Sequence, residues 1–180
     1  MPIATPFYSK LAEHCPNHQW RDWAGKWSVS QYGVTHDYEY YSIRDSAGLL
    51  DITPLFKYDI TGPDAEKLIN RVITRDIRKC KLGQVYYTPW CDDEGKVVDD
   101  GTVWRIRDDF FRVTCAEPNY KWFEDCGFMM DFEIKDVSDD IAAVALQGPH
   151  SRNILSKLFD PQAIASLKFF FLLEPGWHQQ

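Results

Sequence analysis

The hairpin that decides the fold lies at residues 85–106, VYYTPWCDDEGKVVDDGTVWRI. Strand-forming residues flank the acidic, glycine-containing segment CDDEGK, a pattern that predicts two antiparallel strands joined by a turn. The second strand carries two adjacent carboxylates, Asp99 and Asp100, where apolar residues are expected. Because consecutive side chains of a strand point to opposite faces of a sheet, one of the two carboxylates should point inward.

The sequence on either side of the hairpin extends it into a larger sheet. FKYDIT (residues 56–61) predicts a strand, and DAEKLINRVIT after it predicts a helix with Ala65, Leu68, Ile69 and Val72 on one face. Further elements are predicted at residues 110–115 (strand), 117–129 (helix), 132–138 and 141–148 (strands) and 149–159 (helix). Together they predict an α+β fold, an antiparallel sheet with helices packed on it in split βαβ (ferredoxin-like) units.

Length and composition set the class of protein. With 180 residues, 44% of them hydrophobic, the chain can bury one sizeable core, and we predict a single domain over residues 1–180. The apolar run LKFFFLL (residues 167–173) would normally continue into a further element, so we expect this domain to be truncated at its C-terminus. The net charge of −7 without a basic run argues against a nucleic-acid partner. Neither a leader pattern nor a bilayer-length apolar run occurs, which predicts a cytoplasmic protein without a membrane partner.

The first third of the chain is crowded with aromatic residues, as is typical of a core or of a pocket for a flat ligand. They are Trp20, Trp23, Trp27, Tyr32, Tyr38, Tyr40 and Tyr41. His14, Cys15 and His18 lie nearby, but no fourth ligand follows at a usual spacing, so no metal site is predicted.

An inward carboxylate in the hairpin has two interpretations. Its burial costs several kcal/mol unless it is hydrogen-bonded or paired, and such a group is a candidate acid, base or ligand anchor. Alternatively, a bulge or an early strand end lets both carboxylates reach solvent, with Gly101 supplying the kink.

Four segments resemble, in their order along the chain, the amino-terminal folate-binding part of the glycine cleavage T-protein (aminomethyltransferase) family. The similarity is greatest to the branch of tetrahydrofolate-dependent methyltransferases and demethylases, and it covers about residues 5–165. The segments are EYYSIRDSAGLLDITPL (39–55), GQVYYTPWCDDEGKVVDD (83–100), DDFFRVT (108–114) and AVALQGP (143–149).

This resemblance implies tetrahydrofolate-dependent transfer of an aminomethyl or methyl group. It places a catalytic, folate-binding aspartate at Asp99 and a tyrosine that lines the pterin pocket at Tyr87. The implied partners are a small-molecule methyl or aminomethyl donor or a lipoyl carrier protein. Arg44 and Asp51 are expected to form a structural ion pair or a helix cap rather than to act in catalysis.

The sequence departs from the family pattern, mildly at Lys96, which stands where T-proteins have the second glycine of the hairpin turn, and more seriously elsewhere. Ala116 stands where T-proteins carry an asparagine whose amide would hydrogen-bond the ligand. From the resemblance we also expect the family's later folate-holding segment, with its glutamate and arginine, beyond residue 180. The alternative hypotheses are therefore a non-catalytic folate-binding module in regulation or cofactor assembly, and an incomplete fragment without activity.

Overall fold

A computed structural model describes residues 1–173. They form two compact units. Unit 1 comprises residues 1–54 and 142–167, and unit 2 comprises residues 55–141 and 168–173. The single domain expected over residues 1–180 stays a prediction.

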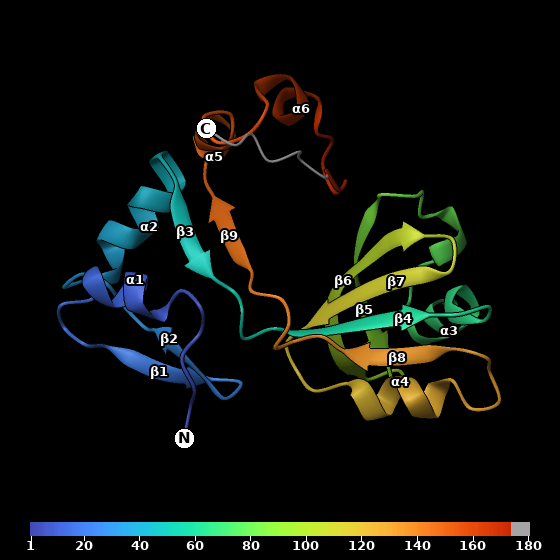
Figure 1. Cartoon of the computed structure of the whole chain (residues 1–180). Helices are drawn as coiled ribbons and strands as arrows, with labels where there is room; N and C mark the ends of the chain where they lie inside the picture. Colours follow the sequence, from blue (N-terminus) through green and yellow to red (C-terminus); the bar gives the residue numbers. More distant parts are fainter. Residues whose placement is uncertain (174–180) are drawn as a thin grey trace. The chain divides into compact units, whose positions relative to one another are not determined.

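Unit 2 is built around a five-stranded sheet in the order β5-β6-β7-β4-β8, and every pair of neighbouring strands is antiparallel. Figure 1 shows α3 and α4 beside these strands. The bounds along the chain are β4 Phe56–Thr61, α3 Ala65–Val72, a 3₁₀ turn at Ile77–Lys79, β5 Val85–Cys91, β6 Val97–Arg107, β7 Phe110–Cys115, α4 Tyr120–Cys126 and β8 Glu133–Asp136.

The connection from β7 through α4 to β8 is a split βαβ unit. Both β7 and β8 pair antiparallel with β4, which lies between them, so β7 and β8 run parallel to each other. A parallel pair needs a crossover, and α4 supplies it. The predicted α+β fold with an antiparallel sheet is confirmed.

The core of unit 2 lies between one face of this sheet and the two helices. All four residues that the helical spacing predicts on the inner face of α3 are buried there. Aromatic rings join α4 to the sheet, since the Phe123 ring lies 5.6 Å from the Tyr58 ring and 5.8 Å from the Trp90 ring, centroid to centroid. Burial of each such side chain stabilises the fold by about 1.5–3 kcal/mol.

The free edge of β5 is partly covered by the run LKFFFLL. The amide of Val85 donates to the carbonyl of Phe170 over 2.8 Å, and the amide of Leu172 donates to the carbonyl of Gly83 over 2.7 Å. The strand-like run therefore contributes an isolated bridge at Phe171 rather than a regular strand. The final segment, residues 174–180, lies outside the described residues.

Unit 1 contains two small antiparallel sheets, β1-β2 and β3-β9. The strand predicted at residues 141–148 pairs with β3 and takes no part in the larger sheet. Gly148 follows it with φ +122°, and a Cβ there would meet the Ser46 carbonyl oxygen at 2.5 Å, so only glycine fits. The bounds are α1 Tyr8–Glu13, β1 Trp20–Trp23, β2 Lys26–Val29, α2 His36–Asp45, β3 Gly48–Asp51, β9 Val144–Gln147, α5 Ser151–Leu155 and α6 Pro161–Ser166.

Across residues 1–173, no helix has both the length and the apolar character needed to cross a bilayer.

Candidate functional site

The register of the hairpin assigns each of its side chains to one face of the sheet. Trp90 lies opposite Asp99, and both are buried on the face that holds the core. Pro89 lies opposite Asp100, and these residues, together with Tyr87, belong to the other face. The prediction that one carboxylate of the pair points inward is confirmed, and the inward one is Asp99.

Asp99 is held by three N–H donors and is only 7% exposed. Its Oδ2 accepts hydrogen bonds from the Asn119 side-chain amide (2.7 Å) and from the Glu117 backbone amide (3.0 Å). Its Oδ1 accepts one from the Asp100 backbone amide over 2.7 Å. Such bonds to a carboxylate are stronger than bonds between neutral groups, so they offset the cost of burying the charge.

Asn119, at the start of α4, connects this carboxylate to the aromatic core. Its side-chain oxygen accepts a hydrogen bond from the Trp90 indole nitrogen over 3.3 Å, while its nitrogen donates to Asp99. The sequence pattern did not identify Asn119 as part of the site. The available signal was its place in the opening turn of the helix predicted at residues 117–129, but asparagine at a helix start usually caps the helix, and this side chain makes no capping bond. Asp99 and Asn119 thus fasten β6 to α4.

Asp100 has a different environment, because it lies beside an exposed tyrosine. The Tyr87 hydroxyl donates a hydrogen bond to Oδ2 of Asp100, and the Tyr87 side chain is 54% exposed. This bond, followed by the negative charge of Asp100, raises the pKa of Tyr87 above its ordinary value. The phenol therefore remains a neutral hydrogen-bond donor at physiological pH.

The outward face continues from this pair across the sheet with further polar contacts. The Trp104 indole nitrogen donates to the Thr102 hydroxyl over 2.7 Å. On β7, Arg112 forms a bidentate ion pair with Asp59, with N–O distances of 2.6 and 2.8 Å. The outward face therefore presents aromatic rings with hydrogen-bonding groups, whereas the inward face is largely apolar.

The structure does not bring the two predicted site residues together, because Tyr87 and Asp99 belong to opposite faces of the sheet. Pro89 lies opposite Asp100, which makes Tyr87 a diagonal neighbour of Asp100. This register depends on a shift between Trp90 and Cys91 that the sequence pattern did not predict. The catalytic role of Asp99 stays a prediction, and its contacts favour an indirect role.

The alternative of an early strand end is wrong, because β6 continues through Gly101 to Arg107. A Cβ at Gly101 would lie 2.1 Å from the Thr114 carbonyl oxygen, so glycine is required by the close approach of β7. A register shift does occur, but on the turn side of the pair, between Trp90 and Cys91. Ala116, at the position of the family's asparagine, is exposed.

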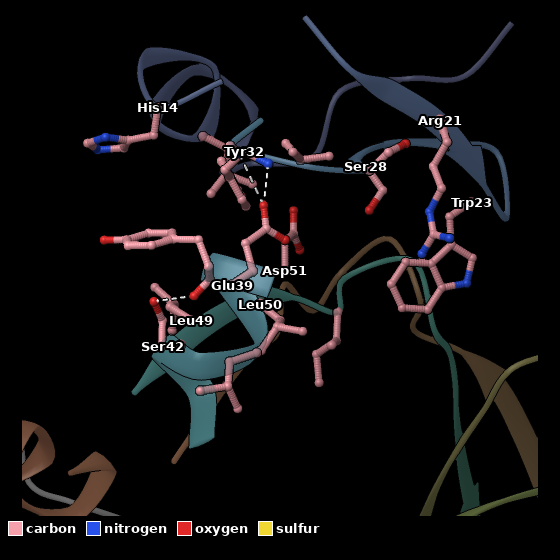
Figure 2. A pocket seen from close by; sticks show the side chains of 18 residues that line it. His14, Arg21, Trp23, Ser28, Tyr32, Glu39, Ser42, Leu49, Leu50 and Asp51 are labelled. Atoms are coloured by element: carbon pink, nitrogen blue, oxygen red, sulfur yellow. Dashed lines mark hydrogen bonds between the residues drawn. The ribbon is translucent and has the colours of Figure 1, made fainter. Parts of the chain in front are cut away.

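A second feature, in unit 1, is a cavity of about 650 Å³. Figure 2 shows Glu39 and Asp51 in it, with Arg21 and Trp23 on one side and His14 on the other. Of the two arrangements expected for Arg44 and Asp51, the ion pair does not occur within residues 1–173. Asp51 instead accepts hydrogen bonds from the Thr5 hydroxyl (2.6 Å) and the Thr53 amide (2.9 Å).

The family model of the GCVT N-terminal domain matches residues 11–174 of the chain. The chain belongs to the GCVT N-terminal domain family. The match spans most of both units, so the family covers the hairpin as well as the cavity-bearing unit. The resemblance to the amino-terminal part of the T-protein family is thereby confirmed.

Among curated proteins, an aminomethyltransferase of Clostridium botulinum (strain Loch Maree / Type A3) is 39% identical over 156 residues, which are 84% of this chain and 41% of that protein. An aminomethyltransferase of Thermoanaerobacter sp. (strain X514) is 34% identical over 153 residues, with 83% and 41% covered. The chain thus spans about two fifths of the length of these relatives.

Among solved structures, the glycine cleavage system aminomethyltransferase T from Bartonella henselae superposes with a TM-score of 0.82. The match covers 98% of this chain and 48% of that one at 21% sequence identity. At this identity the likeness shows that the two proteins share a fold.

Proposed function

We propose that this domain binds tetrahydrofolate for the transfer of a one-carbon group, as an aminomethyltransferase does, and that the outward face of the β5–β6 hairpin contacts the pterin. The observation that carries the proposal is the pairing of an exposed Tyr87 with the Asp100 carboxylate. A pterin is flat and has several N–H donors, so an aromatic wall beside an acceptor suits it. The names of the curated relatives support the same chemistry.

In such a transfer, a folate nitrogen forms the new bond to the carbon, and the donor atom keeps the electron pair of the bond that breaks. Asp100 can orient an N–H of the pterin, stabilise positive charge that develops near the carbon, and take up the proton that the nitrogen loses. Tyr87 holds this carboxylate in place by its hydroxyl while its ring packs on the ligand.

Asp99 supports this arrangement from the inward face. Its carboxylate accepts hydrogen bonds from the Asp100 backbone amide and from the Asn119 side chain at the start of α4. These bonds fix the strand that carries Asp100. The catalytic role that the resemblance assigns to Asp99 is thus assigned to its neighbour, and Asp99 becomes a positioning residue.

The donor of the one-carbon group is the remaining partner. We propose an aminomethyl group on a lipoyl carrier protein, or a small methylated or aminomethylated molecule, because these are the donors that the resemblance implies.

Isothermal titration of the 180-residue chain with tetrahydrofolate tests the proposal. Tyr87→Ala should weaken binding by roughly tenfold, and Asp100→Asn should weaken it to a similar degree. Asp109→Asn, which removes an exposed carboxylate from the β6–β7 turn, is the matched control and should bind like the wild type. Circular dichroism confirms that each variant is folded.

A second readout separates binding from transfer. With an aminomethylated lipoyl carrier protein as donor, Asp100→Asn should slow formation of the one-carbon folate by about 10²-fold. Absence of tetrahydrofolate binding by the folded wild type contradicts the proposal. If folded Asp99→Asn abolishes transfer while Asp100→Asn leaves it intact, the outward face is the wrong surface and the assignment to Asp99 is right.

A further inference from the structure

The cavity of unit 1 has a chemical character that the proposed function does not use. All of its lining residues belong to unit 1, and they come from α1, the β1–β2 hairpin, α2, β3 and the segments that join them. Its volume of about 650 Å³ lies in the range of cavities that bind small organic molecules. Three aromatic side chains line it, Trp23, Tyr32 and Tyr38.

Two carboxylates in the cavity have no cationic partner among residues 1–173. One oxygen of Glu39 accepts hydrogen bonds from the backbone amides of Tyr32 (2.5 Å) and Gly33 (3.3 Å), and the other accepts none from the described residues. Asp51 is held by neutral donors only. Both side chains are partly buried, where an uncompensated negative charge is costly and attracts a cation.

The pKa of Tyr32 is affected by burial and by this negative charge. Burial first, and then the nearby groups Cys15, Asp51 and Glu39, raise the pKa of Tyr32 above its ordinary value. The phenol therefore stays neutral, and its ring can face a bound cation.

A basic group lies on one side of the cavity. The Arg21 guanidinium carbon is 5.6 Å from the centre of the Trp23 ring. Within residues 1–173 this guanidinium group makes no ion pair or hydrogen bond, while the Arg21 backbone pairs with Ser28 in the β1–β2 sheet. Figure 2 shows Arg21 and Trp23 together, apart from the two carboxylates and from His14. Negative and positive side chains are thus both present, at separate places in one cavity.

We propose that this cavity binds a small zwitterion, with an alkylated ammonium group against Glu39 and the aromatic rings and an anionic group at Arg21. Aromatic faces together with carboxylates are the usual recognition elements for alkylated ammonium ions. A bare metal ion is a poorer occupant, since no group of three or more His, Cys, Asp or Glu side chains suited to a metal occurs in the described chain. The cavity is also far larger than a single ion requires.

Titration of the 180-residue chain with three probes tests this inference, with tryptophan fluorescence and calorimetry as readouts. The probes are choline, its uncharged isostere 3,3-dimethylbutan-1-ol, and phosphocholine, which adds an anionic group. Phosphocholine should bind saturably with a dissociation constant below about 10 mM, choline more weakly, and the isostere roughly tenfold more weakly than choline.

Variants separate the two ends of the ligand. Glu39→Gln keeps an oxygen for the Tyr32 and Gly33 amides but loses the charge, and it should weaken choline and phosphocholine by at least about fivefold. Arg21→Gln should weaken phosphocholine alone. The matched controls are Glu13→Gln and Arg44→Gln, which change exposed charges outside the cavity and should bind like the wild type.

Three outcomes overturn the inference: no phosphocholine binding by the folded wild type, equal binding of choline and its isostere, or unchanged binding by Glu39→Gln. Tetrahydrofolate binding by Glu39→Gln should equal that of the wild type. Loss of tetrahydrofolate binding by folded Glu39→Gln would make the cavity part of the folate site and would overturn a separate zwitterion site. The Tyr87 and Asp100 variants test the proposed function alone.

Discussion

Asp99 and Asp100 are adjacent, identical in chemistry and placed on opposite faces of one sheet. Asp99 is fixed by three N–H donors next to the core, while Asp100 meets a half-exposed tyrosine on the outward face. The first carboxylate is 7% exposed and most of its acceptor sites are occupied by the protein, whereas the second one lies beside an exposed side chain. The comparison teaches that burial alone does not identify a catalytic carboxylate; what matters is whether its hydrogen-bonding capacity is already used by the fold.

The largest expected contrast between the two faces concerns their aromatic residues. Trp90→Ala removes a fully buried ring and should reduce the free energy of unfolding by about 3–5 kcal/mol. Tyr87→Ala, on the same strand, should reduce it by under about 1 kcal/mol. Urea denaturation followed by circular dichroism measures both, and similar losses would show that the outward face also carries a core.

Replacing the inward carboxylate should also reduce the free energy of unfolding more than replacing the outward one. Asp99→Ala leaves the buried Asn119 amide and the partly buried backbone amides of Glu117 and Asp100 without this acceptor and should cost about 2–4 kcal/mol. Asp100→Ala should cost under about 1 kcal/mol. The urea midpoints of the two variants give the comparison; a larger loss for Asp100→Ala would contradict the assignment of the positioning role to Asp99.

A smaller effect is expected where the hairpin meets β7. The methyl group of Gly101→Ala would press on the Thr114 carbonyl and should cost about 1–3 kcal/mol. Gly33→Ala is the control, because its methyl group meets nothing closer than 3.7 Å, and it should change stability by no more than about 0.5 kcal/mol. Equal thermal stability of the two variants would mean that β6 and β7 can separate without loss.

The smallest effect is a titration. The raised pKa of Tyr87 should return toward the ordinary tyrosine value of about 10 in Asp100→Asn. Because the folded-state pKa is raised, the hydroxyl–carboxylate bond stabilises the fold fully at pH values below the ordinary one, and this stabilisation is lost as the pH rises through the folded-state pKa. The titration of Tyr87 is obtained by subtracting the tyrosinate absorbance of a Tyr87→Phe variant, once in the wild type and once in Asp100→Asn. The same Tyr87 pKa in both backgrounds would argue against the Tyr87–Asp100 hydrogen bond.

Much of unit 2 could be predicted because its signals are local. The alternation of residue types located the hairpin, and the helical spacing identified the buried face of α3. The partner of the strand at Val144–Gln147 could not be predicted, because nothing in its few residues distinguishes β3 from the larger sheet. The aromatic richness of the first third did indicate a core or a pocket, and three of those rings line the cavity.

The sequence by itself determined that one of two neighbouring carboxylates points inward, because side chains alternate along any strand. Only the tertiary structure decided that Asp99 is the inward one, since that depends on which face of the sheet the helices cover. It also decided that Asn119, twenty residues further along, donates a hydrogen bond to Asp99 and that the Tyr87 hydroxyl donates one to Asp100. Alternation is a property of the backbone of one segment, whereas partners are chosen by packing between segments that are distant in the chain.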